Sequence, residues 1–164
     1  IWKTAVPTDS LKREALYQRF RSRFANDPVP YAQLCVPRMR EVLQACRALG
    51  LKTGLASAGP SWVIDGFLEQ LNLTSAFDET LSGEDCAANK PAPDIYLAAM
   101  RRLGVSPCRT LVVEDSPLGI RAAHEAGATV CAVMPPSAPE LDQSLADVRL
   151  GPLAALLDWL PSAL

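Results

Sequence analysis

The sequence has little of what marks a nucleic-acid-binding or membrane protein. Its 16 lysines and arginines are balanced by 18 acidic residues, so the formal net charge of −2 predicts no basic surface for nucleic acid or an anionic membrane. No apolar run reaches the roughly 18 residues that a membrane-spanning helix needs. Residues 1–7 lack the basic start, apolar stretch and small-residue cleavage site of a signal peptide. We therefore expect a cytoplasmic protein that binds neither nucleic acid nor membrane.

The sequence also lacks the cysteine and histidine patterns of a disulfide framework or a zinc site. Its five cysteines, at positions 35, 46, 86, 108 and 131, are an odd number, widely spaced, and form no Cys-x-x-Cys pair. The only histidine, His124, falls inside a predicted helix. A cysteine nucleophile that a histidine activates is therefore not expected.

From Pro37 onward, segments of helical and of strand character alternate. Apolar residues recur at helical spacing in segments that glycine or proline delimits, and short β-rich runs separate these segments. The expected strands cover residues 52–56, 79–82, 110–113, 129–133 and 147–150. This alternation predicts an α/β fold, with a Rossmann-like parallel sheet and helices on both of its faces. Such sheets bind ligands beyond the carboxyl ends of their strands, so polar residues there are the candidates for a site.

The first part of the chain has a different pattern. A charged helix is expected from residues 8–10 to about residue 25, and residues 29–35 resemble a linker. One charged helix with a narrow apolar face cannot fold alone. The expected domains are residues 1–34, a helical segment with its linker, and residues 35–164, the α/β core. The apolar stripe on the helix leaves the oligomeric state open, and it consists of Leu16, Tyr17, Phe20 and Phe24.

Two polar clusters suggest contacts with a phosphate. Ser57-Ala58-Gly59-Pro60-Ser61 lies between a strand and a helix, where a hydroxyl and free backbone N–H groups suit a phosphate oxygen. A simpler interpretation is that Ser57 or Ser61 caps the helix. Lys90 precedes two closely spaced prolines, which predict a stiff, extended segment that directs the ammonium at an anion. A solvated surface lysine beside a helix start fits the same pattern.

A third cluster, Glu114-Asp115, ends the most β-like run of the chain. Adjacent carboxylates repel each other there unless a cation lies nearby. Carboxylate oxygens suit Mg²⁺, which keeps several waters and takes one or two protein carboxylates. Asp115 or Ser116 could instead cap the next helix. Together, a cation site, a fixed lysine and a hydroxyl–amide loop predict binding of a phosphorylated ligand with a metal, because phosphoryl transfer asks mostly for positioning and charge neutralisation.

Four runs of residues between Pro37 and Pro135 resemble those of one known family, in the family's order. They are Leu55-Ala56-Ser57-Ala58, Gly83-Glu84-Asp85, Lys90-Pro91-Ala92-Pro93-Asp94-Ile95-Tyr96 and Val113-Glu114-Asp115-Ser116-Pro117-Leu118-Gly119-Ile120-Arg121-Ala122-Ala123. They are similar to the haloacid dehalogenase superfamily, and within it to the β-phosphoglucomutase-like phosphatases. The resemblance implies that Ser57, Ala58 and Lys90 bind phosphate, and that Ser57 and Lys90 are catalytic. It implies Asp115 and Glu114 as the Mg²⁺ site, with Asp115 as ligand and Glu114 supporting the metal and its waters. Residues before Pro37 look like the remnant of a helical cap that selects the substrate.

The residue that starts this family's reaction has no match in the sequence. The resemblance implies an aspartate nucleophile, in an Asp-x-Asp motif at the end of a first, central strand, and no Asp-x-Asp occurs in residues 1–164. Loss of a central strand would leave inner strand edges without partners. Either these residues omit an earlier segment, which we favour because the other site residues are kept, or the protein is an inactive homologue. We expect residues 1–164 alone to hydrolyse no phosphate ester.

Several functions fit the resemblance. The first is Mg²⁺-dependent hydrolysis of a small phosphorylated metabolite of sugar-phosphate type, through an aspartyl-phosphate. A phosphomutase of the β-phosphoglucomutase type uses the same intermediate but must exclude water. A dehalogenase needs no Mg²⁺, so the pair Glu114-Asp115 argues against it. The alternative outside the enzymes is a non-catalytic module that binds a phosphorylated ligand or another chain. The sequence leaves the substrate open.

Overall fold

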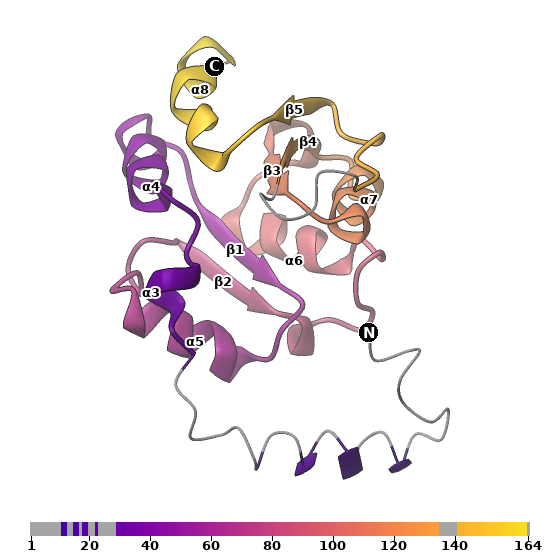
Figure 1. The fold of residues 1–164 in the computed structure, drawn as a ribbon. Helices are drawn as coiled ribbons and strands as arrows, with labels where there is room; N and C mark the ends of the chain where they lie inside the picture. Colours follow the sequence, from indigo (N-terminus) through magenta and orange to yellow (C-terminus); the bar gives the residue numbers. More distant parts are fainter. Residues whose placement is uncertain are drawn as a thin grey trace. The chain divides into compact units, whose positions relative to one another are not determined.

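The computed structural model describes residues 29–134 and 141–163, and before them only residues 11, 12, 15, 16, 18, 19 and 22 (Figure 1). The chain divides into two compact units, residues 1–33 and residues 34–164. In the first unit the described residues between 11 and 22 are helical, as the sequence predicts. Leu16 of the apolar stripe is among them, whereas Tyr17, Phe20 and Phe24 lie outside the described residues. The assignment of residues 1–34 as a cap remnant stays a prediction.

A short helix, α3 (Tyr31–Leu34), lies where the sequence predicts a linker. The predicted linker therefore contains one short helical turn, and its role between two domains stays a prediction. The N–H group of Gln33 donates to the Pro30 carbonyl oxygen at 2.9 Å and closes the turn.

The second unit alternates helices with parallel strands, so the predicted α/β fold is confirmed. Each predicted strand is present within two residues of its expected bounds, and β1 and β3 each end one residue later than predicted. Ser57 and Glu114 are therefore the last residues of strands rather than the first residues of loops. The elements are α4 (Met39–Ala48), β1 (Gly54–Ser57), α5 (Ser61–Gln70), β2 (Glu79–Ser82), the 3₁₀ turn η1 (Gly83–Asp85), α6 (Asp94–Leu103), η2 (Pro107–Arg109), β3 (Leu111–Glu114), α7 (Pro117–Glu125), β4 (Thr129–Val133), β5 (Val148–Leu150), η3 (Leu153–Ala155) and α8 (Leu156–Ala163).

The described strands form two parallel sheets rather than one. β1 pairs with β2, and β3, β4 and β5 pair in that order. Among the described strands, β1 therefore has only β2 as a partner, and β3 has only β4. No residue of β1 is fully buried, whereas a strand inside a parallel sheet is usually covered on both faces.

One hydrophobic core joins the two sheets beneath their strands. It combines residues of β2, β3 and β4 with the inward faces of α6 and α7, which contact each other (Figure 1). A second cluster lies where α4 and α8 cover β4, so the second sheet has helices on both faces. The side chains at the centre of the first core are Leu81, Ile95, Met100, Val112, Ile120, Ala123 and Val130.

Burial affects the thiols of two cysteines of the second unit, Cys131 and Cys46. All five thiols of the chain are free. Cys131 is fully buried in β4, and burial raises the pKa of its thiol to about 11, so it stays protonated and inert at neutral pH. Burial also raises the pKa of Cys46.

None of the helices that the structure describes has the length and apolar character needed to span a membrane.

The fold predicts a large cost for removing Leu81 from the shared core. Leu81 has 0% exposure, so Leu81→Ala should lower the free energy of unfolding by about 2–5 kcal/mol through lost burial and a residual cavity. The matched control is Leu118→Ala, because Leu118 is 56% exposed. This substitution should change the free energy of unfolding by no more than about 0.5 kcal/mol. Urea unfolding followed by circular dichroism measures both. Equal effects of the two substitutions would contradict the proposed core.

Candidate active site

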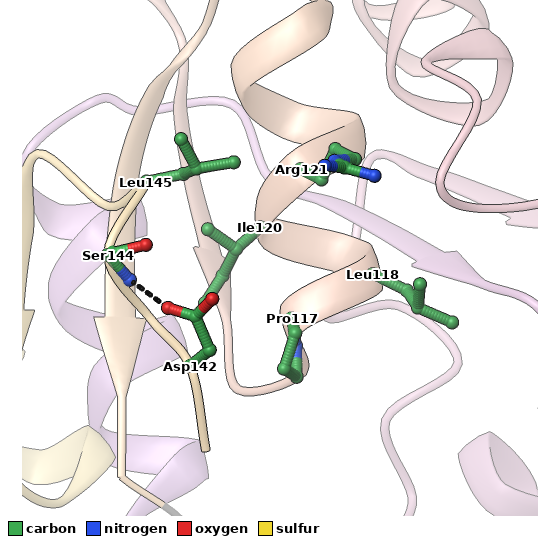
Figure 2. A pocket seen from close by; sticks show the side chains of 7 residues that line it. All are labelled: Pro117, Leu118, Ile120, Arg121, Asp142, Ser144 and Leu145. Atoms are coloured by element: carbon green, nitrogen blue, oxygen red, sulfur yellow. Dashed lines mark hydrogen bonds between the residues drawn. The ribbon is translucent and has the colours of Figure 1, made fainter.

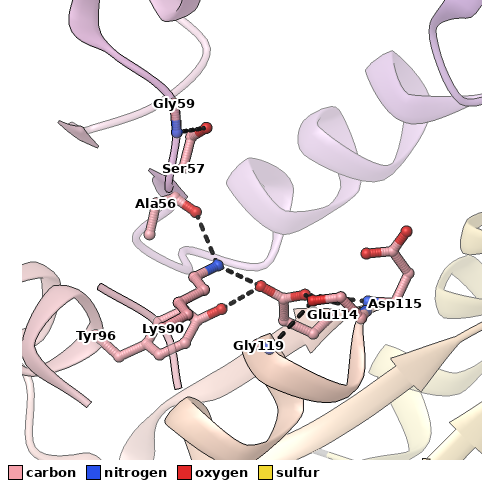
Figure 3. Close-up of polar contacts among 9 residues, drawn as sticks. Ala56, Ser57, Gly59, Lys90, Tyr96, Glu114, Asp115 and Gly119 are labelled. Carbon is pink, nitrogen blue, oxygen red and sulfur yellow. Dashed lines mark hydrogen bonds and ion pairs between the residues drawn. The ribbon is translucent and has the colours of Figure 1, made fainter. Parts of the chain in front are cut away.

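An ion pair connects the two sheets at the carboxyl ends of their strands. Lys90 Nζ lies 2.5 Å from Glu114 Oε1, and the two side chains are 12% and 11% exposed. The same ammonium lies 3.4 Å from the backbone carbonyl oxygen of Ala56 in β1, so Lys90 spans the space between β1 and β3 (Figure 3). Lys90 is thus a largely buried, directed cation, and the alternative of a solvated surface lysine does not hold.

The loop that carries Lys90 has a different shape from the one predicted. Residues 90–93 form a turn, with a cis peptide between Lys90 and Pro91 and a 3.0 Å hydrogen bond from the Ala92 N–H group to the Asn89 carbonyl oxygen. The prediction of a stiff, extended segment is therefore wrong. The lysine is directed by tertiary contacts instead: its carboxylate partner and the Tyr96 ring, whose centroid is 4.7 Å from Nζ.

Tyr96 is a site residue to which the sequence pattern gives no role beyond ending the run that begins at Lys90. It is 5% exposed, and its hydroxyl donates a hydrogen bond to Glu114 Oε1, the oxygen that also accepts from Lys90. Burial, and then the nearby Glu114 carboxylate, raise the pKa of the Tyr96 phenol, so it remains a donor. The signal in the sequence that could have indicated this role is the tyrosine itself, because the hydroxyl of a buried tyrosine usually needs a hydrogen-bond partner.

Glu114 is enclosed by donors on both carboxylate oxygens. Oε2 accepts hydrogen bonds from the Ser116 hydroxyl at 3.2 Å and from the Asp115 N–H group at 3.2 Å. Burial by itself raises the pKa of Glu114, but the Lys90 ammonium and the hydrogen bonds from Lys90, Tyr96 and Ser116 together outweigh burial and hold that pKa below its usual range. Glu114 is therefore ionised, and the cation beside it is Lys90.

Gly119 makes the position of Glu114 possible. A Cβ atom at this position of α7 would collide with all three atoms of the Glu114 carboxylate group. The glycine in the run Ser116-Pro117-Leu118-Gly119 thus lets the carboxylate lie directly against the first turn of the helix, where helix N–H groups favour negative charge.

Asp115 points elsewhere and is exposed (Figure 3). In the part of the chain that the structure describes, no side chain donates a hydrogen bond to its carboxylate. Ser116, not Asp115, caps α7, because its hydroxyl accepts from the Gly119 N–H group at 3.1 Å. The backbone carbonyl of Asp115 is fixed by Gln143, whose Nε2 donates to it at 3.1 Å. Asp115 therefore keeps both carboxylate oxygens available to a cation.

The loop after β1 has a hydroxyl ready to donate. Ser57 Oγ accepts a hydrogen bond from the Gly59 N–H group at 3.1 Å, which leaves the hydroxyl proton for another acceptor (Figure 3). The cap position of α5 is Pro60, which makes no side-chain cap hydrogen bond, and the hydroxyl of Ser61 donates to Glu84 instead of capping the helix. Helix capping by Ser57 or Ser61, the simpler interpretation, is therefore wrong. Ala58 is exposed beside Ser57.

The structure thus brings Lys90 and Glu114 into direct contact and places Ser57, Ala58 and Asp115 at the same ends of the parallel strands. No group of three histidine, cysteine or acidic side chains in the described ranges is arranged to hold a metal ion. A separate pocket of about 130 Å³ lies beside α7, on the side of residues 141–145 (Figure 2). It contains none of the predicted site residues and is lined by Pro117, Leu118, Ile120, Arg121, Asp142, Ser144 and Leu145.

The close approach at Gly119 predicts a sharp effect of one added methyl group. Gly119→Ala should push the Glu114 carboxylate away from Lys90 and Tyr96 and lower the free energy of unfolding by about 1–3 kcal/mol, the value of hydrogen bonds to a charged group less the gain in helix propensity. Gly151→Ala is the matched control, since a Cβ atom there meets nothing within 4 Å. Chemical denaturation of both variants tests this, and a stabilised Gly119→Ala protein would show that the carboxylate lies elsewhere.

The pKa of Glu114 predicts how stability depends on pH. A carboxyl group whose pKa is lower in the folded than in the unfolded protein stabilises the fold above its unfolded pKa of about 4.3, and this contribution disappears as the pH falls through the folded pKa. The free energy of unfolding lost in Glu114→Gln should therefore be largest near pH 7 and should shrink below about pH 4. Urea titrations at several pH values measure this difference. A loss that is constant with pH would contradict the ion pair.

The sequence is similar to those of known proteins over most of its length. The family model of haloacid dehalogenase-like hydrolases matches residues 1–133. YhcW of Bacillus subtilis (strain 168) is 35% identical over 158 residues, which cover 93% of this chain and 70% of that protein. Hexitol phosphatase B of Escherichia coli (strain K12) is 32% identical over 157 residues, which cover 95% of this chain and 70% of that protein.

Solved structures show the same fold. The β-phosphoglucomutase of Clostridium difficile superimposes with a TM-score of 0.79 over 94% of this chain and 67% of its own, at 20% identity. Likeness at this identity concerns the fold alone, and it matches the parallel strands flanked by helices. The family model covers most of the sequence, including all four runs of residues that suggested the resemblance. The chain belongs to the haloacid dehalogenase-like hydrolase family.

Proposed function

We propose that this chain forms the larger part of a Mg²⁺-dependent phosphatase that acts on a small phosphorylated metabolite of sugar-phosphate type. The observation that supports this most is the placement of Lys90, a largely buried cation held between β1 and β3 at the rim where Ser57 and Asp115 also lie. A buried, fixed positive charge beside a free hydroxyl suits a phosphoryl group. A relative that bears the name hexitol phosphatase B supports the substrate class.

In this proposal Ser57, Ala58 and Lys90 bind the phosphoryl group. The Ser57 hydroxyl donates a hydrogen bond to one phosphoryl oxygen, since its own oxygen already accepts a hydrogen bond from the Gly59 N–H group. The exposed backbone at Ala58 offers a second donor. Lys90 stabilises the negative charge on the transferring group, and Glu114 and Tyr96 keep the ammonium in place before the ligand arrives. Positioning and charge neutralisation of this kind supply most of the catalysis in phosphoryl transfer.

Asp115 and Glu114 would hold Mg²⁺, and their chemistry fits the ion. Asp115 offers an exposed carboxylate free of side-chain donors, as a direct ligand needs. Glu114 is already bound to Lys90, Tyr96 and Ser116, so in this proposal it supports the metal and its waters. Mg²⁺ takes few protein carboxylates and keeps several waters, which suits a pair of this kind. When bound, the ion would neutralise charge on the phosphoryl oxygens.

The nucleophile of the proposed reaction is an aspartate that residues 1–164 do not supply in an Asp-x-Asp motif. In the family's chemistry, a carboxylate oxygen bonds to phosphorus while the bond from phosphorus to the substrate oxygen breaks, and water then hydrolyses the aspartyl-phosphate. Among the described strands, β1 pairs only with β2 and β3 only with β4, so each has an edge at which the strand that would carry this aspartate could pair. We therefore propose that residues 1–164 alone are inactive and that activity requires this further strand.

The test uses the natural full-length protein with p-nitrophenyl phosphate as substrate. Hydrolysis should require Mg²⁺, and Asp115→Ala should lower kcat/KM by at least about 100-fold, since several kcal/mol of charge stabilisation depend on the metal. Asp158→Ala is the matched control, because Asp158 is exposed on α8 and belongs to none of the candidate site clusters. It should leave the rate unchanged.

Two results would contradict the proposal in different ways. Full activity of Asp115→Ala, or full activity with the metal chelated, would remove Asp115 from the metal site. No hydrolysis of any phosphate ester by the full-length protein, together with retained binding of inorganic phosphate, would favour the non-catalytic binding module instead.

A further inference from the structure

The loop that would bind phosphate is held from outside by the segment that follows the neighbouring strand. We call residues 57–61 the phosphate loop and residues 82–84 the supporting segment. Because β1 and β2 are parallel and Ser57 pairs with Ser82, both segments begin at the same edge of the sheet. Ser82 is 4% exposed, and its hydroxyl donates a 2.9 Å hydrogen bond to the Gly59 carbonyl oxygen.

Glu84 makes a second contact, at the far end of the phosphate loop. Its Oε2 accepts hydrogen bonds from both the N–H group and the hydroxyl of Ser61, each at 3.0 Å. The Glu84 carboxylate therefore binds the first N–H group of α5. Without it, this helix start would favour a free anion. This leaves Ser57 and Ala58, earlier in the loop, as the donors open to a phosphate.

Gly83 brings the two segments into direct contact between these hydrogen bonds. A Cβ atom at Gly83 would lie 2.8 Å from the Ala58 carbonyl oxygen and 2.9 Å from Asn89 Oδ1, closer than real Cβ contacts allow. The supporting segment thus touches the phosphate loop at three of its residues: Ala58, Gly59 and Ser61.

The supporting segment is itself rigid. The Ser82 hydroxyl accepts from the Glu84 N–H group at 3.1 Å, and Asp85 Oδ2 accepts from the Ser82 N–H group at 2.8 Å, which together form a capping box around η1. In contrast, the phosphate loop contains Gly59, the residue type with the greatest backbone freedom. A segment held by its own hydrogen bonds that also binds the loop at its glycine restricts the orientations of the loop's donors.

We infer that Ser82 and Glu84 are positioning residues of the phosphate site. Ser82 fixes the Gly59 carbonyl and Glu84 fixes Ser61, and together they hold the Gly59 N–H group on Ser57 Oγ, so that the Ser57 proton and the Ala58 backbone face the ligand. The inference rests on the proposed function, because it takes Ser57 and Ala58 as the groups that bind phosphate. Neither Ser82 nor Glu84 touches the ligand in this arrangement.

The experiment measures binding of inorganic phosphate to the natural full-length protein in Mg²⁺, by isothermal titration calorimetry. Ser82→Ala and Glu84→Ala should each raise the Kd by about 3- to 10-fold, the effect of losing one or two hydrogen bonds that organise the site. Glu84→Gln keeps an acceptor oxygen and should recover most of the affinity. Glu69→Ala, a loss of the same side chain in the last turn of α5, should leave the Kd unchanged.

Backbone amide NMR separates positioning from simple stabilisation. In Glu84→Ala the amide signals of Ala58 and Gly59 should shift or broaden while signals of α7 stay in place. A lowered melting temperature with an unchanged phosphate Kd in both alanine variants would overturn the inference. Because Glu84 is exposed, its variants are expected to fold even if Ser82→Ala does not.

Ser57→Ala distinguishes this inference from the function on which it rests. If Ser57→Ala weakens phosphate binding and neither Ser82→Ala nor Glu84→Ala does, the positioning role is wrong and the phosphate site stands. If Ser57→Ala leaves phosphate binding unchanged, the phosphate site itself is wrong, and the inference falls with it.

Discussion

The contact between Lys90 and Glu114 is the interaction on which the rest of the site depends. Lys90 reaches the end of β1 through the Ala56 carbonyl, and Glu114 is the last residue of β3, so a single ion pair ties together two sheets that share no hydrogen bonds between strands. Both charges are largely removed from water, where an unpaired partner would be costly. The buried carboxylate of Glu114 is stabilised by hydrogen bonds from the hydroxyls of Tyr96 and Ser116. It fits against α7 because Gly119 has no side chain.

The two sheets are joined at two levels, and the levels serve different purposes. Beneath the strands, α6 and α7 share one apolar core with β2, β3 and β4. This core stabilises the fold, but hydrophobic contacts are non-directional and do not orient individual side chains at the site. At the carboxyl ends, hydrogen bonds and charges set the direction of each functional group. Among the described strands, β1 pairs only with β2 and β3 only with β4, so each has an edge to which, in the proposed function, a further strand would add.

Parallel strands explain why residues distant in sequence form one site. The ends of β1, β2 and β3 lie at the same edge, and each is followed by a turn into a helix or a 3₁₀ segment. Each turn then depends on its neighbour: the supporting segment after β2 holds the phosphate loop after β1, and the lysine before α6 meets the carboxylate after β3. The site is therefore a set of mutually supporting turns rather than a list of independent side chains.

The sequence by itself determined the order of elements, the candidate residues at the strand ends and the family, because hydrophobic spacing and local motifs act over a few residues. It predicted Ser57, Lys90, Glu114 and Asp115 as neighbours, since parallel strands place their ends together. Only the tertiary structure decided that Lys90 pairs with Glu114, that Tyr96 shares the same oxygen, that residues 90–93 turn, and that Ser82 and Glu84 hold the phosphate loop. The contacts of Lys90, Tyr96, Ser82 and Glu84 join residues 18 to 24 positions apart through packing, which no local pattern in the chain encodes.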